Sequence, residues 1–262
     1  RVRLLYRPDS FRIGLAVSKP SRARLTDGRI GLSHAVFDFA AKPRAAVLWF
    51  STSADEGRTW TTSVPISART SRYVSSGRAS LCVGAGGRLI LPALFEATPP
   101  GARAGYNTMI YCSDDNGRTW QAGATLGPEQ GYMWETSIVH FGRGRLLVTS
   151  RTDVGWVYAS NSGDNGETWE TPRRLDVRQS SSPTHMGIIP GTDTVVMIHY
   201  PRFPVKGAGD RRQAIASLVS RDFGRTWSHY RQIESPRDAP RAHQNVSFRF
   251  IGDAAHVFYS YS

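Results

Sequence analysis

Apolar positions along this chain gather in short runs, and polar segments rich in glycine and aspartate separate them. This arrangement is typical of β-strands joined by turns. Four of the runs stand directly before a recurring turn sequence, at 46–50, 109–111, 157–158 and 215–219. No apolar run approaches the roughly 18 residues that a membrane-crossing helix needs. The pattern therefore predicts an all-β protein without a membrane span.

The recurring turn sequence is S-x-D-x-G-x-T-W, and its four copies end at Trp60, Trp120, Trp169 and Trp227. Its Asp can accept hydrogen bonds from the backbone amides that follow, and its Gly supplies a positive φ. Thr and Trp then favour the start of the next strand. Each copy therefore predicts a strand–turn–strand hairpin. One Asp per copy is too sparse for a calcium shell of about six to eight oxygens, so we expect no metal and no cofactor.

A second repeat alternates with these hairpins. It spans 78–91 and 135–148 in register, and more loosely 184–197 and 245–258. Each copy reads as an apolar strand, a glycine-containing turn and a second apolar strand. The two repeats together predict units of about 50 residues with four antiparallel strands, which is the pattern of a β-propeller blade.

We therefore predict a single β-propeller domain over residues 1–262. Five blades are recognisable in the repeats, and we expect the chain ends to contribute a sixth. Residues 1–6 are expected to form a strand that closes the ring and so removes exposed sheet edges. Arg1 is not a native start, so the chain is compatible with a fragment of a longer protein.

The charge of the chain is strongly basic. Its formal net charge is +12, and of 33 basic residues only Lys19, Lys42 and Lys206 are lysines. Codon usage in a GC-rich genome would explain this excess of arginine without any function. The functional explanation is that Arg holds carboxylates and phosphates with two donors at once. Because the arginines are scattered and not interleaved with aromatic residues, nucleic-acid binding is weakly supported, and an acidic saccharide suits the charge better.

Cys82 and Cys112 are the only cysteines. The repeat places Cys82 on the first strand of its blade and Cys112 on the third, with the second strand between them. We therefore expect two free thiols. No Cys/His spacing indicates a zinc site.

Candidate chemistry lies where first strands begin, because the first strand of a blade lines the central channel and its start faces one end of that channel. The repeat makes four polar positions equivalent there: Arg78, Glu135, Thr184 with its neighbour His185, and Asn245 with His243 nearby. These side chains either converge on one pocket or are solvated loop ends. Glu135 is flanked by Trp134 and Tyr132, and a partly desolvated carboxylate has the raised pKa that suits proton transfer.

These residues carry a family resemblance, most securely over residues 78–230. The four turns resemble the Asp-box (BNR) repeats of the sialidase superfamily. The segment from Glu135 to Arg151 resembles the sialidase segment that holds a catalytic Glu and, further along, an arginine. The segment 210–212 resembles the one that supplies another arginine. Phe11-Arg12-Ile13 is similar to the Phe-Arg-Ile-Pro motif of the first arginine, with Gly14 in place of the proline.

The resemblance implies a sialidase-like, six-bladed propeller in which three arginines clamp a substrate carboxylate. The matching positions are Arg12, Arg151 and one of Arg211 and Arg212, of which we favour Arg212. It further implies an Asp as general acid/base, for which Asp38 is the candidate from its place in the first blade. The family's nucleophile is a Tyr paired with Glu, but Asn245 stands at the aligned position here, and asparagine cannot do that chemistry.

Three functions stay open. We favour a sialidase-like glycoside hydrolase acting on an acidic, sialic-acid-type glycan, with Glu135 as the acid/base or as the remaining partner of the lost tyrosine. The second function is a lyase on uronate polymers, in which Arg neutralises the carboxylate and a Tyr or His moves protons. Its candidate residues are Tyr132, His185, His199, Tyr200 and His243. The third is a glycan-binding propeller without catalysis.

The same resemblance sets the expected partners and location. We expect an acidic carbohydrate or glycoconjugate as ligand, no nucleic acid, and a monomer. Arg78, Tyr132, His185, His243 and Asn245 complete the expected substrate-binding residues beside the arginines. The family favours a secreted or periplasmic location, although no signal peptide is visible in this chain.

Overall fold

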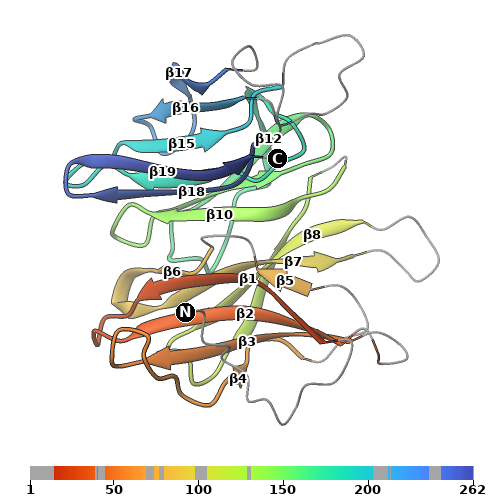
Figure 1. Ribbon diagram of the computed structural model, residues 1–262, viewed down its shortest axis with the longest axis vertical. Helices are drawn as coiled ribbons and strands as arrows, with labels where there is room; N and C mark the ends of the chain where they lie inside the picture. The colour runs from red at the N-terminus through yellow and green to blue at the C-terminus, as the bar shows by residue number, and fades with distance from the viewer. Residues whose placement is uncertain are drawn as a thin grey trace.

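The computed structural model describes residues 15–38, 40, 45–68, 74–76, 80–97, 105–128, 131–202, 212, 214–235 and 243–261. In this part of the chain the regular structure consists of nineteen strands and one short 3₁₀ turn, η2 (Ala85–Gly87). The strands form five antiparallel sheets that follow one another along the chain (Figure 1). The prediction of an all-β fold is confirmed.

Sheets 1, 3, 4 and 5 are meanders in which consecutive strands are neighbours, and sheet 2 departs from this order only at its first two short strands. Sheet 1 contains β1 (Leu15–Arg24), β2 (Ile30–Asp38), β3 (Ala45–Ser53) and β4 (Val64–Pro65). Sheet 2 contains β5 (Val74–Ser76), β6 (Cys82–Val83), β7 (Leu89–Glu96), β8 (Tyr106–Ser113) and β9 (Gln121–Leu126). Sheet 3 contains β10 (Trp134–His140), β11 (Leu146–Arg151), β12 (Trp156–Ser162) and β13 (Arg173–Arg178). Sheet 4 contains β14 (His185–Ile188), β15 (Val195–His199), β16 (Ile215–Ser220) and β17 (Ser228–Glu234), and sheet 5 contains β18 (His243–Ile251) and β19 (Ala254–Tyr261).

The four-stranded unit predicted from the repeats is present in sheets 1, 3 and 4. In sheet 2, the short strands β5 and β6 pair with different parts of β7 and together take the place of one first strand. Two described strands form sheet 5. The closing strand expected over residues 1–6 lies outside the described residues, so the structure describes five sheets.

First strands lie at the centre of the arrangement. β10 contacts β14, and β14 contacts β18. Burial and then the nearby charge of Arg22 on β1 lower the pKa of Arg249 on β18, which places these two strands near each other as well. The first strands of sheets 1, 3, 4 and 5 therefore face a common centre, as the blade pattern predicts.

The motif turns have the hydrogen bonds that the sequence predicts. In the first copy, Asp55 Oδ1 accepts from the Thr59 amide at 2.8 Å, and Asp55 Oδ2 accepts from the Thr59 hydroxyl at 2.7 Å. Ser53 Oγ donates to Asp55 at 2.8 Å, and Trp60 Nε1 donates to the Gly57 carbonyl at 3.2 Å. The other three copies repeat these bonds. The Thr59 backbone donor, followed by the Thr59 hydroxyl, holds the pKa of Asp55 at about 2.

Each of the last three motif turns also contacts the preceding sheet. In the second turn, Gly117 lies against the ring of Phe50 in sheet 1 and leaves no room for a Cβ. In the third turn, Asn165 Oδ1 accepts from the Ala85 amide at 2.9 Å, and Asn165 Nδ2 donates to the Ala85 carbonyl at 3.0 Å. The third turn is thereby fastened to η2 of sheet 2.

The fourth turn uses an aromatic residue for the same purpose. Phe223 stands edge-on to Phe141 of sheet 3, with ring centroids 5.2 Å apart. The Phe223 carbonyl accepts from Asn161 Nδ2 at 2.9 Å. Asn165 and Phe223 occupy the same variable position of the motif, directly before its Gly, and both have left-handed backbone, with φ of 63° and 57°. This variable residue therefore makes the junction between sheets.

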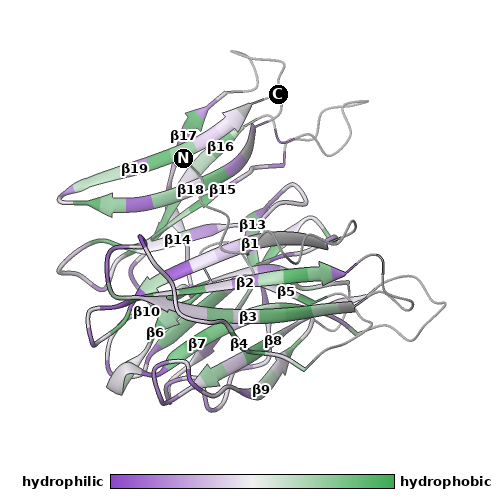
Figure 2. Ribbon diagram, turned by 60° about the horizontal axis from the view of Figure 1, so that its bottom comes forward, coloured by the Kyte–Doolittle hydropathy of each residue, from purple (hydrophilic) through white to green (hydrophobic). Residues whose placement is uncertain are grey.

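Hydrophobic clusters fill the junctions between consecutive sheets, while the connecting turns are mostly hydrophilic (Figure 2). Phe50 belongs to the cluster between sheets 1 and 2, and Ile110 to the cluster between sheets 2 and 3. Val157 lies between sheets 3 and 4, and Ile198 between sheets 4 and 5. Each sheet thus buries its faces against its neighbours in the chain.

The two cysteines are free, as predicted. Ile90 on β7 pairs with Cys82 on one side and with Cys112 on the other, so the second strand separates the two sulfurs. Burial raises the pKa of Cys82 to about 12, which keeps this thiol protonated and unreactive at neutral pH.

Candidate functional site

Strand register brings one end of four sheets to a common edge. The pairs at this edge are Leu15 with Asp38, Trp134 with Arg151, His185 with Ile198, and His243 with Tyr261. In each pair the first strand begins where the second strand ends, at the edge away from the motif turns. We call this edge the mouth. The predicted positions Glu135, His185 and Asn245 lie here, as the repeat alignment implied.

A mostly buried ion pair stands at the mouth of sheet 3. Arg151 Nη1 donates to Glu135 Oε2 at 2.5 Å, and the side chains are 21% and 12% exposed. The Arg151 guanidinium also lies over the Trp134 ring, 4.6 Å from its centroid. Contact with a charge and with an aromatic face fixes the arginine in one orientation.

A β-bulge aims the Glu135 side chain. The register of β10 shifts between Trp134 and Ser137, and Glu135 has a left-handed φ of 50°. A bulge bends its strand and redirects one side chain, and a non-glycine residue in this conformation costs roughly 1–2 kcal/mol. The strand therefore departs from regular pairing at the residue that the repeat alignment singled out.

Arg151 and Arg212 meet at Ser181. Arg151 ends β11 of sheet 3, and Arg212 stands three residues before β16, the third strand of sheet 4. Arg151 Nε donates to the Ser181 hydroxyl at 3.1 Å, and Arg212 Nη2 donates to the Ser181 carbonyl at 3.2 Å. Arg212 also lies 5.8 Å from the ring centroid of Tyr200, and its carbonyl accepts from the His243 amide at 2.7 Å. Two of the predicted arginines thus share one contact residue at the mouth.

Three aromatic rings form a wall beside the ion pair. The Tyr106 and Trp134 centroids are 5.1 Å apart, those of Tyr132 and Trp134 are 6.0 Å apart, and those of Tyr106 and Tyr132 are 6.2 Å apart. All three side chains are partly exposed. Trp134 Nε1 is buried and, within the described part of the chain, has no hydrogen-bond partner. The wall offers a ligand an aromatic surface.

The histidines proposed for proton transfer are buried. His185, His199 and His243 are each 3% exposed. Burial lowers the pKa of His199 to about 4, so this ring is neutral at pH 7. The ring nitrogens of His199 and His243 bond to no other described residue. Tyr200 is also buried, and its hydroxyl accepts from the Val246 amide at 3.3 Å.

Asn245 has the backbone of Glu135 but a different contact. The register of β18 shifts between Gln244 and Ser247, and Asn245 has a φ of 56°. Its side chain is exposed, and Nδ2 donates to Ser260 Oγ on the neighbouring strand at 3.2 Å.

The remaining predicted residues divide into two groups. Arg12, Arg78 and Arg211 lie outside the described residues. Asp38 lies at the mouth of sheet 1, where its Oδ1 accepts from the Ala40 amide at 3.2 Å in the turn after β2. Thr184 is buried beside His185, and its hydroxyl bonds to that of Thr149 at 2.7 Å.

A phenol–carboxylate pair that the repeat alignment missed also stands at the mouth. The Tyr259 hydroxyl donates to Glu234 Oε1, from the end of β19 to the end of β17. The Tyr259 ring stands edge-on to His243, with centroids 5.4 Å apart. Since the His243 amide bonds to Arg212, contacts run without a break from Arg212 to Glu234. Neither Tyr259 nor Glu234 belongs to a repeated motif, so no sequence pattern marked them.

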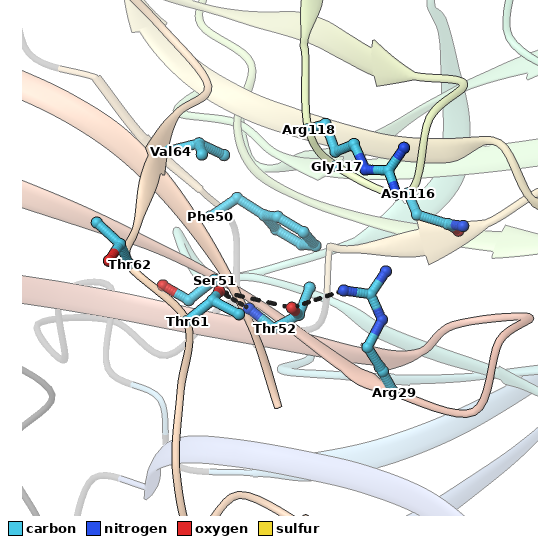
Figure 3. A pocket seen from close by; sticks show the side chains of 10 residues that line it. All are labelled: Arg29, Phe50, Ser51, Thr52, Thr61, Thr62, Val64, Asn116, Gly117 and Arg118. Atoms are coloured by element: carbon cyan, nitrogen blue, oxygen red, sulfur yellow. Dashed lines mark hydrogen bonds between the residues drawn. The ribbon is translucent and has the colours of Figure 1, made fainter. Parts of the chain in front are cut away.

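The opposite edge holds a pocket of about 190 Å³ between sheets 1 and 2 (Figure 3). It is lined by the end of β3, by Arg29 and by the second motif turn. Arg29 is engaged there, because it pairs with Asp27 at 2.7 Å and donates to Thr52 Oγ1 at 3.0 Å. No predicted site residue lines this pocket.

The described residues hold neither a candidate metal cluster nor a membrane-spanning helix. They contain no group of three or more His, Cys, Asp or Glu placed to hold a metal ion. In the same residues no helix is long and apolar enough to cross a membrane.

Known proteins match this chain both in sequence family and in fold. Residues 12–262 match the family described as BNR repeat-like domain. A protein of unknown function from Dyadobacter fermentans is similar over 94% of this chain and 76% of its own, at 17% identity and a TM-score of 0.66. The NanB sialidase from Streptococcus pneumoniae is similar over 94% of this chain and 53% of its own, at 12% identity and a TM-score of 0.72. A Trypanosoma rangeli sialidase, with 2,3-difluorosialic acid as a covalent intermediate, is similar over 94% of this chain and 43% of its own. The identity is 13% and the TM-score 0.64.

At these identities the solved structures show a shared fold, and this chain spans about half the length of those sialidases. The family match covers nearly the whole chain, and it confirms the resemblance of the four turns to BNR repeats. The chain therefore belongs to the BNR repeat-like domain family.

Proposed function

We propose that the mouth binds the carboxylate of an acidic, sialic-acid-type glycan and that this sialidase-family protein hydrolyses the glycan. The observation that carries the proposal is the meeting of Arg151 and Arg212 at Ser181. Nη2 of Arg151, and Nε and Nη1 of Arg212, have no hydrogen-bond partner among the described residues. These donors remain for a carboxylate, which Arg binds through two parallel hydrogen bonds.

The surroundings of the two arginines suit a sugar. Glu135 takes up one donor of Arg151 and sets its orientation, while the aromatic wall of Tyr106, Tyr132 and Trp134 covers one side. Ligand sites of this kind combine apolar and aromatic surface with a few fixed polar groups. The proposal keeps a six-bladed ring as its frame, of which the described residues supply five sheets.

Hydrolysis through a covalent intermediate needs a nucleophile. Asn245 cannot supply one, and the pair of Tyr259 and Glu234 can. In the proposed step the Tyr259 oxygen bonds to the anomeric carbon and its proton passes to Glu234. The bond to the leaving oxygen breaks, and that oxygen takes a proton from an acid, for which Asp38 remains the candidate. Water then bonds to the anomeric carbon and gives a proton to the acid group, now a base, while the bond to the Tyr259 oxygen breaks and that oxygen takes its proton back from Glu234.

A fluorogenic sialoside tests the proposal. We expect turnover by the unaltered protein and a fall in kcat/KM of roughly 100-fold or more for Arg151→Ala and Arg212→Ala, because each removes a charged donor from the bound anion. Tyr259→Phe should lower kcat and leave KM nearly unchanged. Arg58→Ala, in a motif turn at the opposite edge, is the matched control. No turnover by the unaltered protein would overturn the hydrolase.

A glycan-binding protein without catalysis is the second candidate, and the bonding of Asn245 to Ser260 favours it. Sialylated-glycan affinity that falls with added salt and with Arg151→Ala, without turnover, would select this function. A uronate lyase would instead release unsaturated products with ultraviolet absorbance. The burial of His185, His199 and His243 speaks against these three as its proton carriers.

A further inference from the structure

Two arginines of the outermost strand of sheet 3 lie against one indole. The guanidinium carbon of Arg174 is 4.3 Å from the Trp156 ring centroid, and that of Arg178 is 4.8 Å from it. Both guanidinium carbons lie within 4.8 Å of the same ring centroid, so the distance between the two carbons is less than twice 4.8 Å. Trp156 is partly exposed and both arginines are exposed. Cation–π contact holds two like charges next to each other on this surface.

Neither guanidinium has a carboxylate partner within the described part of the chain. Both side chains lack a hydrogen bond or ion pair there, and the side chain of Asp176, which stands between them on the exposed face of β13, forms no ion pair either. Stacking uses the flat face of a guanidinium and leaves the N–H donors at its edge free. The pair therefore presents to solvent two oriented guanidinium groups that no described carboxylate contacts.

The position of this pair relates it to the mouth. Trp156 begins β12 and pairs with Arg178, at the same edge of sheet 3 as Glu135 and Arg151. A third arginine, Arg202, lies so close to Gly155 that a Cβ there would be 2.6 Å from its Nη1. β13 is two strands outward from β11, and neighbouring strands are about 4.8 Å apart. The outer pair and Arg151 therefore belong to the same edge of one sheet.

We propose that Trp156, Arg174 and Arg178 form a second anion-binding site, which we call the rim platform, and that its ligand is a polyanionic polysaccharide carrying repeated sulfate or carboxylate groups. An anion relieves the repulsion between two cations that have no ion-pair partner among the described residues, and it accepts hydrogen bonds from the N–H groups at the edges of both guanidinium groups. The site stands by itself, whether or not the mouth is catalytic.

The two arginines that lie over the Trp156 ring favour a polysaccharide over a nucleic acid as the ligand. Single-stranded nucleic acids bind through bases that stack on open aromatic faces along a basic groove. At the rim platform the guanidinium groups themselves lie over Trp156, so the described residues there offer contacts to anionic groups and not a stacking surface.

The test measures binding of heparin, a sulfated polysaccharide, at several salt concentrations by the unaltered protein and by two double variants. Arg174→Gln/Arg178→Gln removes the platform. Arg58→Gln/Arg118→Gln removes the same charge from two exposed positions in motif turns at the opposite edge. We expect the platform variant to bind about tenfold more weakly, with a salt dependence lower by about two ions, and the control to change less than twofold.

Each other result overturns the proposal. Equal losses in the two variants would show attraction to net charge alone. Single-stranded DNA bound as tightly as heparin, with the same loss in the platform variant, would assign the site to nucleic acid. Circular dichroism and the melting temperature of each variant report whether the fold is kept. Arg174→Lys/Arg178→Lys retains both charges, and full heparin affinity in this variant would contradict a role for the guanidinium donors.

Discussion

Glu135 and Asn245 occupy the same bulged position at the start of the first strands of two different sheets. Their φ angles are 50° and 56°, and the pairing register shifts next to both. Glu135 bonds to Arg151, whereas Asn245 bonds to Ser260. The bulge thus belongs to the repeated scaffold, and the residue placed on it decides the chemistry of each sheet's mouth.

The bulge makes the first prediction. Asn245→Val should destabilise the protein by about 1–2 kcal/mol, because a β-branched residue is strained at a positive φ that Asn tolerates. Ser247→Val, two residues further along the same exposed strand face, is the control and should be neutral or stabilising. Urea unfolding of both variants measures the difference. Equal effects would mean that the bulge is not maintained in solution.

Removal of the Glu135 carboxylate should destabilise the fold, because it leaves the positive charge of Arg151 without its ion-pair partner. Glu135→Ala leaves Arg151 without its partner in a site where both side chains are mostly buried, and we expect a loss of about 1–3 kcal/mol in the free energy of unfolding. Glu56→Ala breaks an ion pair with Arg24 in which the side chains of Glu56 and Arg24 are 67% and 54% exposed, and it should cost clearly less because solvent screens an exposed pair. Denaturant titrations of the two variants make the comparison. A smaller loss for Glu135→Ala than for Glu56→Ala would contradict it.

Alanine substitutions at two glycines with the same backbone conformation distinguish backbone strain from steric crowding. Gly28 and Gly117 both have a φ of 84°, but a Cβ on Gly28 would meet nothing within 4 Å, whereas one on Gly117 would collide with Phe50. Gly28→Ala should cost about 1 kcal/mol from the left-handed backbone, and Gly117→Ala clearly more, since overpacking adds about 1–3 kcal/mol. Thermal melting tests the order, and a smaller effect at Gly117 would show that the second turn does not dock as described.

The motif aspartates should make stability fall in acid. Hydrogen bonds hold the pKa of Asp55 at about 2, below its value of about 3.9 in an unfolded chain. A lowered pKa in the folded state stabilises the protein above the unfolded value, and this contribution is lost as the pH falls through the folded value. The difference in unfolding free energy between the unaltered protein and Asp55→Asn should therefore be constant from pH 7 to about pH 5 and shrink toward pH 2. A difference that does not change over this range would exclude the linkage.

Local chemistry explains why the repeats could be read from sequence. The bonds from Asp55 and Ser53 are all made within one motif copy, so the spacing of a few residues is enough to predict them. The register of the second repeat then placed Glu135 at the mouth and separated Cys82 from Cys112 by a strand. Periodicity and turn residues carry this information directly.

Contacts between sheets carry no such signal. Ser181 lies in the connection between β13 and β14, and only the folded chain shows that Arg151 and Arg212 meet there. The pair of Tyr259 and Glu234 likewise joins two sheets. The bulge at Glu135 adds a residue without changing the apolar pattern of the strand. The direction of the Glu135 side chain could therefore not be predicted from the alternation of apolar and polar residues.

The docking of Asn165 on Ala85 and of Phe223 on Phe141 bears on how the blades are ordered. One junction uses an amide that both donates and accepts, and the next uses an aromatic edge. A motif turn therefore recognises only the neighbour that it meets in the native order, and exchanging two blades would leave an amide facing a ring. The residue directly before the motif glycine thus matches the surface of the preceding sheet at these two junctions, so the third and fourth turns are not interchangeable.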